Sequence, residues 1–271
     1  MKSSRIGFLG AGNMAGALIS GLLASGAVDE SQICISGARP GRLAELAKTH
    51  GIQKRTSNAE LVAWANVVVL SVKPQVVPAV LSECGASMGA GHLVISIAAG
   101  VPIAALETML GTGARVVRAM PNTPALVRAG ATAVSAGTHA SPADLDVART
   151  LFDAVGKTVV LSEAYLDAVT GLSASGPGYV MLFVEALADG GVKSGLPRDV
   201  ALLLATQTVL GSAQLLATTG EHPARLKDMV TSPGGTTIAG LAVLETAGVR
   251  GALINAVESA TARATELGKK H

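Results

Sequence analysis

The stretch Ile6-Gly-Phe-Leu-Gly-Ala-Gly-Asn-Met-Ala15 decides how the chain folds. Its first four residues have the pattern of a short strand, and an apolar helical pattern follows over residues 14–24. Between the two, Gly10 permits a tight turn, Gly12 lets the backbone approach a pyrophosphate, and Ala15 keeps the helix close to its strand. We therefore expect a dinucleotide site rather than a purely structural turn. Its expected contacts are Gly10, Ala11, Gly12, Asn13, Met14 and Ala15.

Strand and helix patterns alternate through the first part of the chain. Strands are predicted at residues 6–9, 32–36, 67–72, 93–97, 115–119, 132–135 and 158–161, with helices at 14–24 and 42–49. Continuous apolar runs such as Val67-Val-Val-Leu70 are typical of parallel strands that are covered on both faces. The pattern predicts an α/β fold whose N-terminal part is a doubly wound, Rossmann-type sheet.

The pattern changes near Ser162, after which strand-like runs disappear and Ala/Leu/Val-rich stretches predict five or six helices. We expect an NAD(P)-binding domain at residues 1–162 and a helical substrate-binding and dimerisation domain at 163–271. Residues 200–220 carry no charge and are long enough to cross a bilayer, but they contain Gln207 and Gln214 and lack flanking aromatic anchors. We expect this segment to be buried in protein, and the charge-poor helical half to pack against a second copy of itself.

Composition excludes several classes of function. A net charge of +2 and six aromatic residues in 271 argue against nucleic-acid binding. Two cysteines and five scattered histidines form no metal-ligand spacing and no disulfide framework, so no metal is expected and the cytoplasm is the expected location. No signal peptide or membrane partner is expected.

The end of the second predicted strand bears on the choice between the two nicotinamide cofactors. An NAD site usually has an Asp or Glu there, whereas this chain has Ser36 and, shortly after it, Arg39. Because both side chains suit a 2′-phosphate, we expect NADPH, with NADH used more weakly. The alternative is that Arg39 merely solvates a loop.

Two more stretches, Ser71-Val-Lys-Pro-Gln75 and Ser96-Ile-Ala-Ala-Gly100, follow predicted strands at the edge where such sheets bind ligands, and Ala98 leaves room for a nicotinamide.

A second Gly-rich entry, Ser232-Pro-Gly-Gly-Thr-Thr-Ile238, opens an apolar helix that is predicted to run to about Glu245. Exposed backbone N–H groups at a helix N-terminus form a pocket for a carboxylate. An ordinary helix cap would give the same pattern.

Several motifs follow one another along the chain: Phe8-Leu-Gly-Ala-Gly-Asn-Met-Ala15, Val72-Lys-Pro-Gln75, Arg118-Ala-Met-Pro-Asn-Thr-Pro124, Gly171-Leu-Ser-Ala-Ser-Gly-Pro-Gly-Tyr179, Ala188-Asp-Gly-Gly-Val-Lys-Ser-Gly-Leu-Pro197, Leu226-Lys-Asp228 and Thr231-Ser-Pro-Gly-Gly-Thr-Thr-Ile-Ala-Gly-Leu-Ala-Val-Leu-Glu245. Through these motifs the chain resembles pyrroline-5-carboxylate reductase over essentially its whole length. The last of these is the most specific. Met229 departs from the pattern, because some relatives have a polar Asn there.

The resemblance implies NAD(P)H-dependent reduction of 1-pyrroline-5-carboxylate to L-proline, the last step of proline biosynthesis. It implies cofactor contacts at the glycine turn and at Ser36, Asn58, Ser71, Val72, Lys73, Pro74 and Ala98. It implies substrate contacts at Glu163, Ser232, Gly235, Thr236 and Thr237. It also implies homodimers with intertwined helical domains, often assembled into a decamer.

Reduction of a cyclic imine needs a hydride at carbon and a proton at nitrogen, and Thr237 is the expected catalytic residue facing that nitrogen. Two alternatives stay open. Another two-domain reductase, such as a β-hydroxyacid dehydrogenase, would need a lysine in the helical half, for which Lys193 is the candidate. A cofactor-binding scaffold without catalysis is the other.

Overall fold

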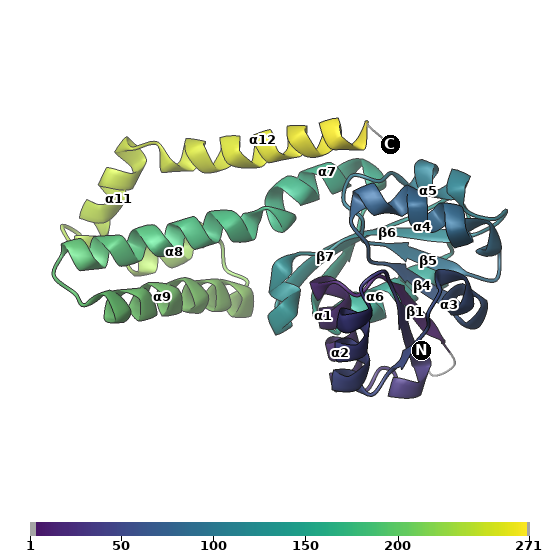
Figure 1. The fold of residues 1–271 in the computed structure, drawn as a ribbon. Coiled ribbons are helices and arrows are strands. Elements are labelled where there is room, and N and C mark those ends of the chain that lie inside the picture. Colours follow the sequence, from purple (N-terminus) through teal and green to yellow (C-terminus); the bar gives the residue numbers. More distant parts are fainter. Residues whose placement is uncertain (1–3, 270–271) are drawn as a thin grey trace. The chain divides into compact units, whose positions relative to one another are not determined.

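The computed structural model describes residues 4–269. Its first part is an eight-stranded sheet with helices on both faces (Figure 1). Along the sheet the strands follow the order β3-β2-β1-β4-β5-β6-β7-β8. Their bounds are β1 Ile6–Leu9, β2 Ile33–Ser36, β3 Gln53–Lys54, β4 Val67–Leu70, β5 Leu93–Ser96, β6 Arg115–Met120, β7 Gly130–Ala136 and β8 Gly156–Val160.

Strands β1 to β6 are parallel and have the order of a doubly wound dinucleotide fold, as the sequence predicts. Strand β7 is antiparallel to β6, and β8 is parallel to β7. This reversal was not predicted. Residues 121–129 connect β6 to β7, fewer than the dozen or so that a crossover between parallel neighbours needs. All seven predicted strands are present, whereas β3 was missed because two residues show no periodicity.

The helices form two layers that bury the sheet on both faces. One layer contains α1 Asn13–Ala24, α2 Pro40–His50 and α6 Pro142–Asp153, and the other contains α3 Asn58–Trp64, α4 Val77–Cys84 and α5 Ile103–Met109. Because side chains alternate along a strand, Ile6 and Phe8 of β1 pack into the first layer and Leu9 into the second. Every residue of β1, β2, β4 and β5 is buried, which explains their unbroken apolar runs.

The chain divides into two compact units. One comprises the residues up to Ser175 together with those from Glu258 onward, and the other comprises Gly176–Val257. Within the described residues, the second unit contains helices and no strand, as predicted for the second half of the chain. Its helices are α8 Gly176–Lys193, α9 Arg198–Thr219, α10 Pro223–Met229, α11 Thr236–Thr246 and the beginning of α12 Val249–Gly268.

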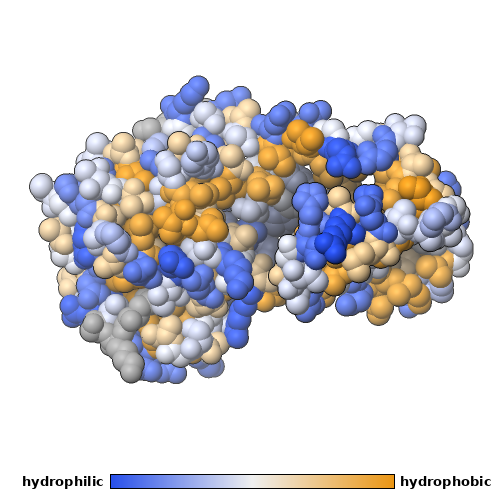
Figure 2. Space-filling model, turned by 180° about the vertical axis from the view of Figure 1, so that it is seen from behind, coloured by the Kyte–Doolittle hydropathy of each residue, from blue (hydrophilic) through white to orange (hydrophobic). Residues whose placement is uncertain are grey.

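The second unit buries few side chains by itself. Its buried hydrophobic residues are Ala188, Ala201 and Ala205, where α8 packs on α9. By length and composition α9 could cross a membrane, with a mean hydropathy of 1.6 and only 11% of its apolar window buried. The expected burial of this segment is therefore not met within the single chain. Figure 2 shows hydrophobic side chains on the surface of this unit, at the right of the view.

Candidate active site

The glycine turn after β1 packs tightly against the end of β4. Gly10 has a φ of +110°, which favours glycine, and a Cβ there would lie 2.8 Å from the carbonyl oxygen of Ser71. The Ser71 hydroxyl donates to the carbonyl oxygens of Leu9 and Gly10 at 3.0 and 2.9 Å. At Gly12, by contrast, a Cβ would meet nothing closer than 3.9 Å. Gly10 thus serves the packing of the turn, whereas Gly12 leaves the backbone open to a ligand.

Helix α1 begins at this turn without a side-chain cap. Its N-cap residue is Gly12, and the N–H of Gly16 donates to the carbonyl oxygen of Gly12 at 3.1 Å. The N–H groups of the preceding turn therefore have no acceptor within the helix. An anionic group at this helix end would accept hydrogen bonds from them and interact favourably with the helix dipole.

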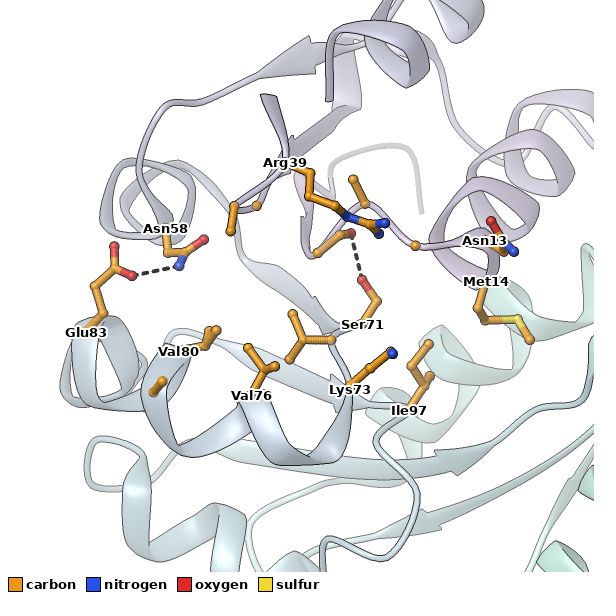
Figure 3. Close-up of a pocket in the computed structure, with 17 residues that line it drawn as sticks. Asn13, Met14, Arg39, Asn58, Ser71, Lys73, Val76, Val80, Glu83 and Ile97 are labelled. Carbon is orange, nitrogen blue, oxygen red and sulfur yellow. Dashed lines mark hydrogen bonds between the residues drawn. The ribbon is translucent and has the colours of Figure 1, made fainter. Parts of the chain in front are cut away.

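A cavity of about 880 Å³ opens beside the turn (Figure 3). Predicted cofactor residues that line it are Gly10, Ala11, Gly12, Asn13, Met14, Arg39, Asn58, Ser71, Val72 and Lys73. The other predicted residues, Ala15, Ser36, Pro74 and Ala98, are not among those that line it, and Ala15, Ser36 and Ala98 are buried. The volume and the uncapped helix end suit a dinucleotide, so the residues present fit the cofactor that the sequence predicts.

The cavity has a further wall that the sequence analysis missed. The unpredicted lining residues are Gly37, Ala38, Val76, Ala79, Val80, Glu83 and Ile97. Four of them share one face of α4 and of the turn before it, because Ala79, Val80 and Glu83 follow Val76 by three, four and seven residues. That spacing was visible in the sequence, but only the sheet topology shows that this face borders the cavity. Figure 3 shows Asn58 and Glu83 at one end and Asn13, Met14 and Ile97 toward the other.

The second Gly-rich entry forms the predicted helix start. Gly234 has a φ of +69°, Gly235 is the N-cap of α11, and the N–H of Gly235 donates to the carbonyl oxygen of Ser232 at 3.0 Å. No side chain caps the helix, and Thr236 and Thr237 occupy its first turn. Ser232 and Thr236 are exposed, and Gly235 and Thr237 are half-buried. The first amides of α11 are thus open to a carboxylate.

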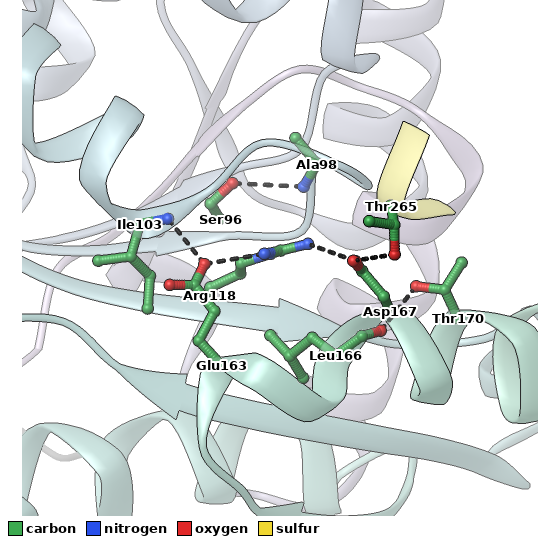
Figure 4. Close-up of polar contacts among 9 residues, drawn as sticks. All are labelled: Ser96, Ala98, Ile103, Arg118, Glu163, Leu166, Asp167, Thr170 and Thr265. Carbon is green, nitrogen blue, oxygen red and sulfur yellow. Dashed lines mark hydrogen bonds and ion pairs between the residues drawn. The ribbon is translucent and has the colours of Figure 1, made fainter. Parts of the chain in front are cut away.

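Glu163, a predicted substrate residue, has partners within its own unit. Its Oε1 accepts hydrogen bonds from the N–H of Ile103 and from Nη1 of Arg118, both at 2.8 Å. The Arg118 side chain is only 5% exposed and also lies 3.9 Å from Asp167, whose Oδ2 accepts from the Thr265 hydroxyl at 2.8 Å (Figure 4). One buried arginine therefore joins β6, α5, the short helix α7 Leu166–Val169 and the end of α12. This cluster was not predicted from the sequence, although an arginine inside an apolar strand was a signal of it.

Three further side chains of the second unit lie on α8 and α10, and the first of them is the lysine of the competing interpretation. Lys193 is exposed in the last turn of α8, where a cation interacts favourably with the helix C-terminus. Asp189, on the same helix, forms an ion pair with Arg198. Met229 is 73% exposed at the end of α10.

Comparison with known proteins gives one consistent family. The family description "Pyrroline-5-carboxylate reductase dimerisation" matches residues 163–267, and "NADP oxidoreductase coenzyme F420-dependent" matches residues 5–100. A pyrroline-5-carboxylate reductase of Methanosarcina acetivorans is 47% identical over 270 residues, covering 100% of both chains. The solved structure of a pyrroline-5-carboxylate reductase from Coxiella burnetii has a TM-score of 0.93 and 38% identity, covering 98% of this chain and 99% of that one. A pyrroline carboxylate reductase from Plasmodium falciparum with NADP bound has a TM-score of 0.88 and 32% identity, covering 99% of both.

Proposed function

The chain belongs to the pyrroline-5-carboxylate reductase family, and we propose that the cavity beside α1 and the loop before α11 carry out the reaction of that family. The protein is an oxidoreductase of proline biosynthesis that uses NADPH to reduce the C=N bond of 1-pyrroline-5-carboxylate to L-proline. The observation that carries the assignment of the cofactor site is the cavity at the uncapped N-terminus of α1. The bound cofactor supplies the hydride.

In this proposal the cavity residues hold the dinucleotide. The backbone at Gly12, Asn13 and Met14 binds the pyrophosphate, because the N–H groups of the first turn of α1 lack acceptors within the helix. Arg39 and Lys73 line the same cavity and supply positive charge toward the phosphates. Buried Ser36 acts through its hydrogen bond to Asn58, at 2.8 Å. Ala15, Pro74 and Ala98 serve as the packing behind the binding surface.

We propose that the substrate carboxylate binds at residues 232–237. The open amides at the start of α11 and the hydroxyls of Ser232 and Thr236 are its donors, and Gly235 keeps the backbone accessible. Fixing a small ring in this way can remove roughly 7–11 kcal/mol of the barrier. Glu163 is the remaining proposed substrate residue, and its Oε1 also accepts hydrogen bonds from Arg118 and from the N–H of Ile103.

Thr237 is the proposed catalytic residue. A hydroxyl is a weak acid, so its role is to orient an already protonated ring nitrogen or to pass a proton from water to the product amine. A rival lysine-based mechanism has less support, because Lys193 is an exposed residue at the end of α8.

The protein acts on a small molecule and oligomerises. We propose that residues 1–162 are the NAD(P)-binding domain and 163–271 the substrate-binding and dimerisation domain, which agrees with the family match from residue 163. The proposed oligomer is a homodimer with intertwined helical domains, and dimers of this kind would assemble into a decamer. The proposed location is the cytoplasm, which suits the two unpaired, buried thiols of Cys34 and Cys84.

The test is the loss of absorbance at the reduced-nicotinamide band when the purified protein meets 1-pyrroline-5-carboxylate. We expect oxidation of NADPH, slower oxidation of NADH, and none without substrate. Binding of NADPH without oxidation would instead identify a cofactor-binding scaffold without catalysis.

A further inference from the structure

Three side chains form a hydrogen-bonded chain at one end of the cofactor cavity. The hydroxyl of Ser36 donates to Oδ1 of Asn58 at 2.8 Å, and Nδ2 of Asn58 donates to Oε2 of Glu83 at 2.7 Å. Ser36 ends β2 and is fully buried, Asn58 begins α3, and Glu83 lies near the end of α4. Asn58 and Glu83 line the cavity together (Figure 3).

The direction of these hydrogen bonds is fixed by chemistry. An ionised carboxylate only accepts, so the amide of Asn58 has to turn its NH₂ group toward Glu83 and its oxygen toward Ser36. The Ser36 hydroxyl proton is then committed to Asn58 and is directed away from any ligand in the cavity. What this end presents to a ligand is therefore one amide N–H and an exposed carboxylate with free lone pairs.

This end of the cavity is where the adenosine ribose belongs. In a doubly wound sheet the pyrophosphate lies at the N-terminus of α1, and the ribose lies toward the end of the second strand, which here is Ser36. An acid at this place normally binds the ribose 2′-hydroxyl of NAD. The end of β2 lacks one, but Glu83 of α4 brings a carboxylate to the same end of the cavity.

We propose that Glu83 is a specificity-determining residue that shifts cofactor choice toward NADH. The inference rests on the proposed cofactor cavity. The carboxylate of Glu83 accepts a hydrogen bond from a ribose 2′-hydroxyl and repels a 2′-phosphate, while Arg39 on the wall of the same cavity attracts that phosphate. The two opposed charges set the ratio of NADPH to NADH use, so NADH remains a usable cofactor of an enzyme that uses NADPH.

Binding measurements test this without turnover. The dissociation constants of NADP⁺, NAD⁺, 2′,5′-ADP and 5′-AMP are measured by titration calorimetry on the full-length protein at low salt, for the native chain and for Glu83→Gln. Glutamine keeps the length of the side chain and an oxygen that can accept from Asn58, so it removes the charge while preserving the contact. We expect the NADP⁺-to-NAD⁺ affinity ratio to rise roughly two- to fivefold, as for a partly exposed charge pair. The ratio for 2′,5′-ADP to 5′-AMP should rise in parallel.

The matched control is Glu60→Gln, which removes the same charge from neighbouring α3 at a side chain that does not line the cavity. Its affinity ratios should stay at the native value, and the effect of Glu83→Gln should shrink at 0.5 M salt because Glu83 is exposed. An unchanged ratio in Glu83→Gln, or an equal change in both variants, overturns the role of Glu83 and leaves the cofactor cavity standing. Failure of the native protein to bind any of the four ligands overturns the cavity assignment and this inference together.

Discussion

Thr237 lies in the first turn of α11, where its hydroxyl is next to open backbone amides. Replacing it with alanine keeps those amides and the helix, since alanine is a good helix former. We expect Thr237→Ala to lower kcat by roughly 10²- to 10⁴-fold, the usual contribution of general acid–base help. The dissociation constant for NADPH should stay near the native value. Steady-state kinetics and fluorescence titration measure the two quantities.

Lys193→Ala is the natural control for Thr237, because the lysine belongs to the competing mechanism. The exposed side chain at the end of α8 should leave kcat within about twofold. Unchanged turnover in Thr237→Ala, or a collapse in Lys193→Ala, would move the chemistry away from the start of α11.

Cys84 gives the protein a pH-dependent stability at alkaline pH. Burial, reinforced by the nearby Glu83 carboxylate, raises the pKa of its thiol from 9.0 to about 11. The side chain is 2% exposed and donates to the carbonyl oxygen of Val80. Between pH 9 and 11 the unfolded chain releases a proton that the folded chain retains, so this contribution to stability is full below about pH 9 and is lost as pH rises toward 11.

The corresponding experiment compares the free energy of unfolding of the native protein and Cys84→Ala at pH 8 and pH 10.5, at one protein concentration. We expect the native protein to lose more stability than the variant over this interval, by roughly 1–2 kcal/mol. Other groups that titrate in this range affect both proteins equally. Parallel pH curves would mean that the folded thiol titrates at its ordinary pKa.

At the scale of elements, local sequence patterns predicted individual strands and helix starts, but they did not predict which elements lie next to one another. The seven predicted strands and the start of α11 came from runs and turn residues that lie next to one another in the sequence. The short β3, the reversed β7 and the cavity-lining face of α4 depend on which elements become neighbours, and no local pattern contains that. Ser36 shows the same limit. Its position at the end of β2 was predicted, but its hydrogen bond to Asn58 needed the fold.

The Arg118 cluster makes a prediction about one element, the end of α12. Arg118→Met leaves the half-buried carboxylates of Glu163 and Asp167 without the cation that holds them, which costs roughly 1–3 kcal/mol. Because Asp167 also holds Thr265, we expect loss of hydrogen-exchange protection over residues 258–268. Hydrogen-exchange mass spectrometry measures this directly.

Arg263→Met is the matched control for Arg118→Met. Arg263 lies near Thr265 on the end of α12, but its side chain is exposed and pairs along the helix with Glu266. It should change stability by less than about 1 kcal/mol and leave protection of residues 258–268 intact. Equal effects of the two substitutions would mean that the buried cluster does not anchor the helix.

The whole molecule has too much exposed hydrophobic surface in its helical unit to exist as a single copy. Large exposed hydrophobic residues on α8, α9 and α11 include Met181, Leu182, Phe183, Leu202, Leu203, Leu204, Leu210, Leu215, Val243 and Leu244. The apolar, weakly charged composition of the second half has the same explanation, because an element that is buried between copies needs no solvated face. We therefore expect contacts between copies to cover this hydrophobic surface and to stabilise the helical unit.

Leu203→Glu tests whether α9 is part of the contact between copies. Leu203 is 66% exposed in the single chain, so a glutamate there would be harmless in a monomer but would become a buried, unpaired charge in an interface. We expect size-exclusion chromatography with light scattering to show a smaller species than the native protein, together with a lower melting temperature. Leu126→Glu introduces the same charge at a comparably exposed leucine, 55%, on the sheet-containing unit, and it should keep the native mass. A native mass for Leu203→Glu would place the dimer contact on helices other than α9, and a loss of mass in both variants would mean that added charge, rather than the position on α9, disrupts the assembly.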